Sequence, residues 1–167
     1  MTNAKTAPPF DFGALDLAAL SDTPFEFEVE HPETGDGLGV FVAVIGAESE
    51  GFQQYLRAEG NALRRKAFEA QRKGKPDEPL TIEDEEETGL RALSACVKGW
   101  RTVIDGKSEP AIFVGGERME SNPANVLAWL RKFRWVRGQL NNATATLANY
   151  LGNSPPASVI TPKPSSN

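Results

Sequence analysis

His31 and Cys96, the only histidine and the only cysteine of this chain, are the side chains best suited to nucleophilic catalysis or metal binding. A zinc site needs three or four ligands, and His31 precedes a proline with no cysteine or second histidine nearby. Cys96 falls at an apolar spacing, where a thiol packs as a small hydrophobic residue and lacks the exposure that a reactive thiolate needs. We therefore expect a protein that is not an enzyme and has no cofactor or metal site.

A run of carboxylates from Glu83 to Glu87 is the next candidate for chemistry. General acid–base catalysis needs carboxylates whose environments push their pKa values apart. Consecutive residues at a helix start point in all directions, so we expect most of these groups to lie in water and to complement the helix dipole. The alternative is a surface for a partner protein.

Residues 57–75 are rich in arginine and lysine. Single-stranded nucleic acids bind where such charges are interleaved with aromatic side chains, and here only Phe68 lies among them. Residues 1–50 carry ten acids against Lys5 alone, and the net charge of the whole chain is −5. The sequence therefore favours basic residues that lie in water or pair with an acidic protein, with nucleic acid as the third alternative.

The length of 167 residues suits one domain with irregular ends. The hydrophobic fraction of 40% is low for a compact globule, so part of the chain is expected to lie outside the core. No apolar run approaches the ~18 residues that cross a bilayer, and the N-terminus does not have the pattern of a signal peptide. A lone cysteine gives no sign of an oxidising compartment. These features predict a soluble, cytosolic protein.

Residues 23–46 predict a β-hairpin. Phe25, Phe27 and Val29 alternate with glutamates, which gives one apolar and one acidic face. The segment from His31 to Gly37 supplies turn residues, and a nearly continuous apolar run follows as the return strand.

Two helices are expected next. Residues 49–73 have Ser49 as N-cap and an apolar stripe along one face, and a glycine and a proline end the helix. After a linker at 77–80, Thr81 caps a second helix. Its apolar residues recur at intervals of three and four, which predicts a core helix that reaches Trp100. These residues are Leu90, Leu93, Cys96, Val97 and Trp100.

The last part of the chain predicts a small hairpin followed by helices. Val103–Ile104 and Ala111–Val114 are expected to pair. Asn122 then caps a helix with proline at its first position. The helical pattern continues to Leu151 after a bend near Phe133.

Three tryptophans lie in the C-terminal half of the chain. Trp100 and Trp135 are assigned to the core by their helical spacing. Trp129 is left open between the core and an interface, where tryptophan is enriched at binding hot spots.

These elements predict an α+β fold over residues 23–153, with an N-terminal β-hairpin followed by a small, mainly α-helical domain. Residues 1–22 contain a Pro-Pro pair and are expected to form an arm that is flexible or docked. Residues 154–167 are rich in proline and serine and are expected to be a disordered tail.

Several short motifs follow one another along residues 25–153. They are His31-Pro32-Glu33-Thr34-Gly35, Lys98-Gly99-Trp100, Val103-Ile104-Asp105-Gly106-Lys107, Asn122-Pro123-Ala124-Asn125 and Asn149-Tyr150-Leu151-Gly152-Asn153. Their order resembles the tail assembly chaperones of long-tailed, siphovirus-like bacteriophages and prophages. The first motif is similar to the family's HP-x-TG turn, and the Tyr-Leu-Gly-Asn sequence is similar to its NFLG ending.

The resemblance implies a protein of the host bacterial cytoplasm that acts in tail morphogenesis. Such a chaperone binds the tape measure protein, recruits the major tail protein that forms the tail tube, and is absent from the finished virion. An apolar tape measure helix would aggregate unless its apolar face were covered. The alternative is a structural minor tail or head–tail connector protein, which has the same fold and stays in the virion.

The family also implies a longer form of the chain made by a programmed −1 frameshift, which would be a further partner. Thr161-Pro162-Lys163 and Lys73-Gly74-Lys75 can both be encoded with a slippery heptamer, so the codons of the gene decide whether one exists. A homo-oligomer stays open. No nucleic acid and no membrane are expected as partners.

Partner binding is expected on an exposed apolar and charged surface rather than in a pocket. The candidate residues are Arg64, Arg65, Phe68, Trp129 and Phe133. For Phe133 the alternative is packing in the core.

Overall fold

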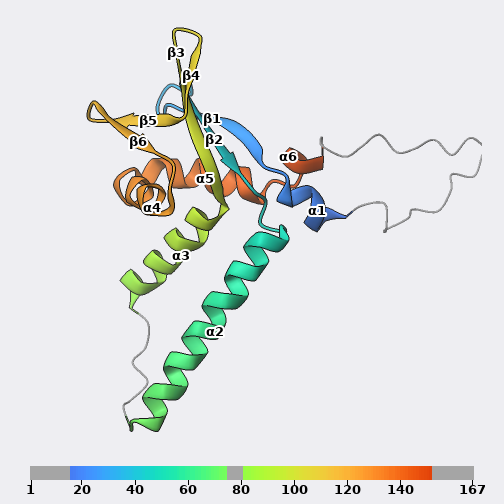
Figure 1. Ribbon diagram of the computed structural model, residues 1–167, viewed down its shortest axis with the longest axis vertical. Coiled ribbons are helices and arrows are strands. Elements are labelled where there is room, and N and C mark those ends of the chain that lie inside the picture. The colour runs from blue at the N-terminus through green and yellow to red at the C-terminus, as the bar shows by residue number, and fades with distance from the viewer. Residues whose placement is uncertain (1–15, 75–80, 152–167) are drawn as a thin grey trace, which may run out of the picture.

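The computed structural model describes residues 16–74 and 81–151, which form six helices and six strands, and the α+β class is confirmed. The strands lie together at one end of the molecule, α4 and α5 lie beside them, and α2 extends away from this body (Figure 1). The predicted linker at 77–80, the predicted tail at 154–167 and residues 1–15 of the predicted arm lie outside the described residues.

The predicted N-terminal hairpin is confirmed. Strand β1 (Phe25–Glu30) pairs antiparallel with β2 (Gly37–Val44), so that Phe25 lies opposite Val44 and Phe27 opposite Val42. The apolar residues of β1 contact the core, and its glutamates are exposed. The alternation of phenylalanine and glutamate thus sets which face of the strand is buried.

Helix α3 (Ile82–Cys96) begins at the predicted Thr81 cap but ends at Cys96, so the prediction that it reaches Trp100 was wrong. Val97 and Trp100 lie on strand β3 (Val97–Ile104), which pairs antiparallel with β2. Trp100 lies opposite Val42, and the sheet satisfies the backbone groups that another helical turn would have used.

The hairpin predicted between residues 103–104 and 111–114 was also wrong. Strand β3 turns at Asp105–Gly106, where both residues have positive φ, and pairs with β4 (Lys107–Glu109). This gives a four-stranded sheet in the order β1-β2-β3-β4. Strand β5 (Ala111–Val114) pairs instead with β6 (Glu117–Glu120) in a separate two-stranded sheet.

The predicted bend near Phe133 separates two helices. Helix α4 (Pro123–Lys132) has Asn122 as N-cap, whose side chain accepts a hydrogen bond from the Asn125 N–H at 2.9 Å. Phe133 is not helical, and α5 (Arg134–Ala145) follows directly. The short helix α6 (Ala148–Leu151) ends the described chain.

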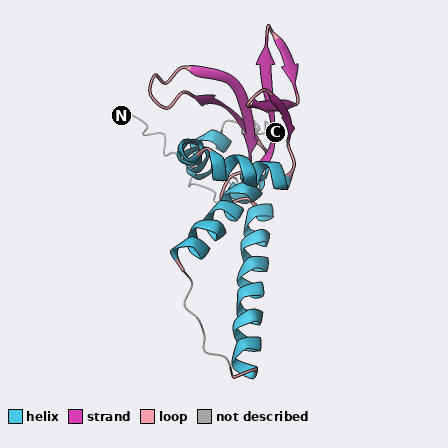
Figure 2. Ribbon diagram, turned by 90° about the vertical axis from the view of Figure 1, so that its left-hand side faces the viewer, coloured by secondary structure: helices cyan, strands magenta, loops and turns pink. Residues whose placement is uncertain are grey.

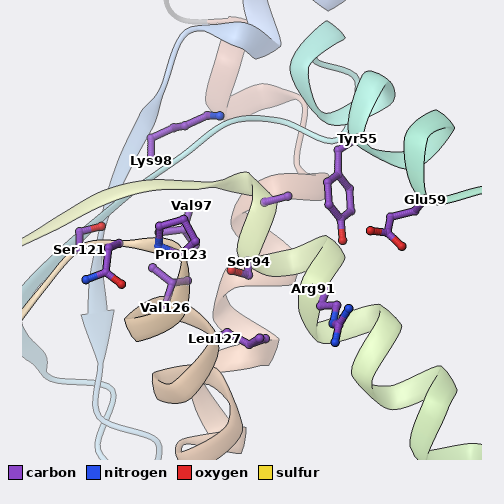
Figure 3. A pocket seen from close by; sticks show the side chains of 12 residues that line it. Tyr55, Glu59, Arg91, Ser94, Val97, Lys98, Ser121, Pro123, Val126 and Leu127 are labelled. Atoms are coloured by element: carbon purple, nitrogen blue, oxygen red, sulfur yellow. The ribbon is translucent and has the colours of Figure 1, made fainter. Parts of the chain in front are cut away.

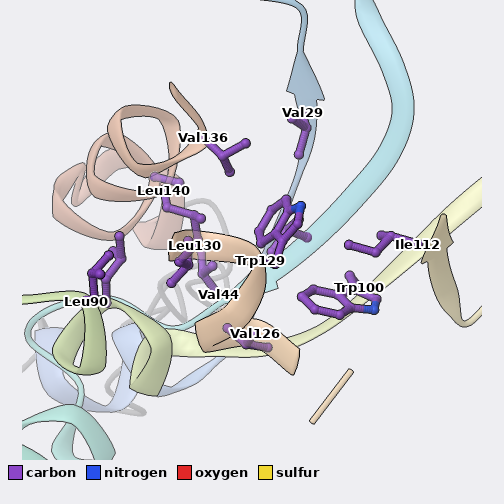
Figure 4. Packing of buried hydrophobic residues seen from close by; sticks show 13 residues of the cluster. Val29, Val44, Leu90, Trp100, Ile112, Val126, Trp129, Leu130, Val136 and Leu140 are labelled. Carbon is purple, nitrogen blue, oxygen red and sulfur yellow. The ribbon is translucent and has the colours of Figure 1, made fainter. Parts of the chain in front are cut away.

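The core lies between the four-stranded sheet and helices α3, α4 and α5 (Figure 4). Trp100 from β3 and Trp129 from α4 meet there edge to face, with ring centroids 5.3 Å apart. The Trp100 indole N–H donates to the carbonyl of Met119 on β6 at 3.0 Å, which ties the second sheet to the first. Trp135, which was assigned to the core, is 38% exposed because Val136 and Leu140 fill the buried positions of α5.

Helix α1 (Leu17–Asp22) docks on the same body. Ser21 is buried, and its carbonyl accepts the Gly46 N–H at 2.8 Å just after β2. Tyr150 of α6 is buried nearby and packs edge to face on Phe25, with ring centroids 6.1 Å apart. This part of the predicted N-terminal arm is therefore attached to the domain.

Helix α2 (Glu50–Arg72) is the long helix that the sequence predicts, with the Ser49 side chain accepting the Phe52 N–H. None of its residues is buried. It runs away from the sheets past the start of α3, so its C-terminal half stands apart from the body in both views (Figures 1 and 2). The apolar stripe read from the sequence is present, but the described chain does not bury it.

Candidate functional site

His31 and Cys96 both have structural roles. The His31 Nδ1 accepts weak hydrogen bonds from the Glu33 and Thr34 N–H groups, at 3.3 and 3.4 Å, inside the β1–β2 turn. Cys96 is 2% exposed, and burial raises the pKa of its thiol to about 11. A thiol with this pKa stays protonated at neutral pH and is a poor nucleophile.

The acidic start of α3 is a contact between helices, which the sequence did not reveal. Thr81 and Asp84 form a reciprocal capping box. Glu86 and Glu87 instead form ion pairs with arginines. The Glu86 Oε1 lies 2.7 Å from the Arg137 Nη1. The arginines that pair with these two glutamates are Arg91, Arg131, Arg134 and Arg137. The carboxylates of α3 therefore attach this helix to α4 and α5.

Replacing Glu86 and Glu87 by glutamine should lower the thermal unfolding midpoint by a few degrees at pH 7. Hydrogen bonds from Arg137 and Arg131 hold the pKa of the two carboxyls below the ordinary value of 4.5. A carboxyl whose pKa is lower in the folded state stabilises the fold above its unfolded pKa, and this contribution is lost as the pH falls through its folded pKa. Calorimetry from pH 7 downwards should therefore show the difference between the midpoints of wild type and variant shrinking once the pH falls below 4.5.

The matched control is the double variant Glu83→Gln/Glu85→Gln. These acids lie on the same turn and are exposed, and they form no ion pair with another described residue. An equal loss of stability in the control at pH 7 would mean that the total charge of α3, rather than its arginine pairs, sets the effect.

The structure separates the candidate binding residues into two groups. Arg64, Arg65 and Phe68 are exposed on the C-terminal half of α2, where Phe68 is 62% exposed. Trp129 is 6% exposed and belongs to the core, because its ring packs on Trp100. Its remaining exposed edge lines a hollow of about 360 Å³, which Phe133 also lines. Phe133 is half-buried against the core at the α4–α5 junction, away from α2.

The first half of α2 is held to the body along one side. An open cleft of about 600 Å³ lies between α2, α3 and the start of α4. Tyr55 and Glu59 face it from α2, and Arg91 faces it from α3 (Figure 3). Burial raises the pKa of Tyr55 above its ordinary value, so the phenol is neutral and acts as a packing group. Contacts with α1 and α3 hold the base of α2, including a hydrogen bond from the Gly51 N–H to the Asp22 carboxylate at 3.3 Å.

One free face of α2 forms an apolar strip, which we call the α2 seam. Its members are spaced alternately by three and four residues, so they line a single side of the helix. They are Leu56, Gly60, Leu63, Ala67 and Ala70. Leu56 and Leu63 are 41% and 40% exposed, although leucine side chains of this kind normally pack against another element.

A hollow of about 350 Å³ lies at Gly60, at the edge of the α2 seam that carries Arg57 and Arg64. It is lined by Leu56, Arg57, Gly60, Asn61 and Arg64, and a Cβ built on Gly60 would meet no atom within 4 Å. The sequence contained the signal for this feature, a glycine inside a helix, but there it indicated only a weak point of the helix. In the structure it is a notch beside Leu56 that is bordered by Arg57 and Arg64.

Neither a metal centre nor a membrane span is found in the part of the chain that the structure describes. Within residues 16–74 and 81–151, no group of His, Cys, Asp and Glu side chains is arranged to hold a metal ion. None of the described helices is both long and apolar enough to cross a bilayer. In comparisons with known proteins, no family model, no curated protein and no solved structure matches this chain.

Proposed function

We propose that this protein is a tail assembly chaperone of a long-tailed bacteriophage or prophage. It binds the tape measure protein in the host cytoplasm, recruits subunits of the tail tube, and is released before the virion is complete. The proposal rests on the resemblance of the motifs along residues 25–153, and it is supported by helix α2, which presents exposed leucines and arginines beyond the body of the domain.

An extended helix with a partly apolar surface suits a reversible coat. A long tape measure helix must keep its apolar face out of water until tube subunits polymerise around it. Helix α2 offers aliphatic side chains for this face and cations at its edges. Contacts that are shared between a few aliphatic groups and exposed charges give moderate affinity, which lets the polymerising tube protein displace the chaperone.

The proposal is tested by a pull-down of the tagged chain from phage-producing cells, with purified virions examined in parallel by mass spectrometry. Capture of the tape measure protein and absence of the bait from virions are expected. Peptides from a frameshifted longer form in the same pull-down would identify that further partner. Stoichiometric bait in virions would instead identify a structural minor tail or head–tail connector protein.

Reversing the charge of two arginines on α2 should weaken this capture. The variant Arg64→Glu/Arg65→Glu is expected to retain its helical circular dichroism, since both side chains are exposed, and to capture roughly tenfold less tape measure protein. The matched control is Lys107→Glu/Arg118→Glu, which changes the net charge equally at exposed positions of β4 and β6. Loss of the helical signal in the first variant would show that the arginines are structural.

A further inference from the structure

The α2 seam has the spacing of a helix that packs lengthwise on another helix. Leu56 and Leu63 are seven residues apart, as are Gly60 and Ala67, and the two sets interleave by four and three. This is the heptad arrangement in which the side chains of one helix enter holes on its neighbour. Within the described residues no helix occupies this position, because α3 contacts α2 on the adjacent side, at Tyr55 and Glu59.

The hollow at Gly60 specifies the size of what would pack there. A helix whose own seam residues are small would leave the hollow empty, and an empty apolar hollow loses van der Waals contacts. An aliphatic side chain the size of leucine, entering between Leu56 and Arg64, would occupy part of it and contact Leu56. The partner should therefore present large aliphatic residues along the face that meets α2.

The edges of the α2 seam specify the charge of the partner. Arg57 and Arg64 lie along one edge, and Glu59, Lys66 and Lys73 lie along the other. Residues 61–73 carry Arg64, Arg65, Lys66, Arg72 and Lys73 against Glu69, a local charge of +4 in a chain whose net charge is −5. Residues at these edges set partner choice in paired helices, because they face the edges of the other helix. Carboxylates are the complementary groups.

We propose that the α2 seam binds an acidic amphipathic helix of a partner protein, whose aliphatic side chains pack along the seam and enter the hollow at Gly60. Carboxylates at the edges of that helix pair with Arg57, Arg64 and the lysines of the opposite edge. The inference rests on the proposed function, because it names the site on this chain that binds the tape measure protein and the chemistry of the helix that binds there.

A second copy of this chain fits the α2 seam less well. Two parallel copies would place Gly60 against Gly60 and set the two +4 segments side by side. Two antiparallel copies would bring the edge that carries Arg57 and Arg64 against itself. Nucleic acid would use the charges but not the leucines, and it needs stacked aromatic side chains that the seam lacks.

The direct test is binding of synthetic peptides to the full-length protein, followed by fluorescence anisotropy. One peptide of about four heptads carries leucine at the seam positions and glutamate at both edges, and its matched control carries lysine at every glutamate position. The acidic peptide should bind at least about tenfold more tightly than the lysine peptide, and its affinity should fall as salt is added. Equal binding of the two peptides, or none by the acidic peptide, would overturn the inference.

Two pairs of variants locate the binding face. Gly60→Leu should reduce affinity for the acidic peptide at least about tenfold by filling the hollow, whereas Gly138→Leu on an exposed part of α5 should leave it unchanged. Arg64→Glu should weaken binding more than Arg65→Glu, because Arg65 lies on the face opposite the seam. Equal effects within either pair would overturn the assignment of this face.

Other occupants of the seam give distinct results. Sedimentation of the wild type as a dimer that Gly60→Leu dissociates would assign the seam to a second copy, and competition by single-stranded DNA against the acidic peptide would assign it to nucleic acid; either would overturn the inference. If the acidic peptide does not bind but the tape measure protein is still captured, only this inference fails. If the peptide binds as expected but the bait remains in virions, only the proposed function fails.

Discussion

Trp129→Ala is expected to lower the free energy of unfolding by about 3–5 kcal/mol, because it removes a large buried side chain and leaves a cavity against Trp100. Small domains have a total stability of about 5–15 kcal/mol, so this single change should bring the protein close to unfolding at 37 °C. Urea denaturation followed by circular dichroism measures the difference directly.

The control for this prediction is Trp135→Ala on α5. Trp135 is 38% exposed, and its removal should change the free energy of unfolding by less than about 1 kcal/mol. If Trp129→Ala left stability unchanged and abolished capture of the partner, Trp129 would be an interface residue and the tryptophan pair would not hold the core together.

Leu56→Ser/Leu63→Ser is expected to separate binding from stability. Both leucines are about 40% exposed on a helix with no buried residue, so the thermal midpoint should change by no more than a few degrees. Capture of the tape measure protein should fall at least about tenfold, because the two residues supply most of the aliphatic surface of the α2 seam. A pull-down measures the capture and calorimetry measures the thermal midpoint, both on the same preparation.

Phe68→Ser provides the comparison, since Phe68 is 62% exposed and lies away from the α2 seam. It should reduce capture much less than the double leucine variant. A comparable loss from Phe68→Ser alone would place the partner on the opposite, arginine-rich face of α2. A collapse of the thermal midpoint in the leucine variant would mean that α2 is stabilised by contacts with the body through these residues.

Local signals in the sequence predicted the helix starts and the first hairpin well. Ser49, Thr81 and Asn122 all cap helices in the structure through their own side chains. The alternation of phenylalanine and glutamate in β1 also predicts its buried face. These signals work because a cap or an alternating strand depends on residues only a few positions apart.

The remaining errors come from contacts between distant segments. Val97 and Trp100 have a spacing that suits a helix, but β2 lies beside them in space, and they pair with β2 as part of a strand. Trp129 and Trp135 share a helical pattern, and only the docking of α4 and α5 on the sheet decides which of them is buried. Pairing between segments that lie far apart in sequence overrides local preference.

The candidate binding site was also only partly predictable from local sequence patterns. Amphipathic spacing predicted the α2 stripe, but spacing does not tell whether the residues that cover such a stripe belong to the same chain. The structure shows that Leu56 and Leu63 are partly exposed and that a hollow lies at Gly60, next to Leu56. The pairs that Arg131 and Arg137 form with Glu87 and Glu86 were likewise hidden, because the partners are 44 and 51 residues apart in the sequence.

Hydrogen exchange of the chain, alone and mixed with the tape measure protein that the proposed function assigns to it as partner, tests most directly whether α2 is the binding surface of the proposed chaperone. We expect the two proteins to form a complex in which amide exchange slows along residues 50–72, because a bound helix stabilises α2 against local opening. The sheets should exchange at unchanged rates. Failure to form a complex, or protection confined to β5, β6 and α4 with α2 unaffected, would contradict the role proposed for α2.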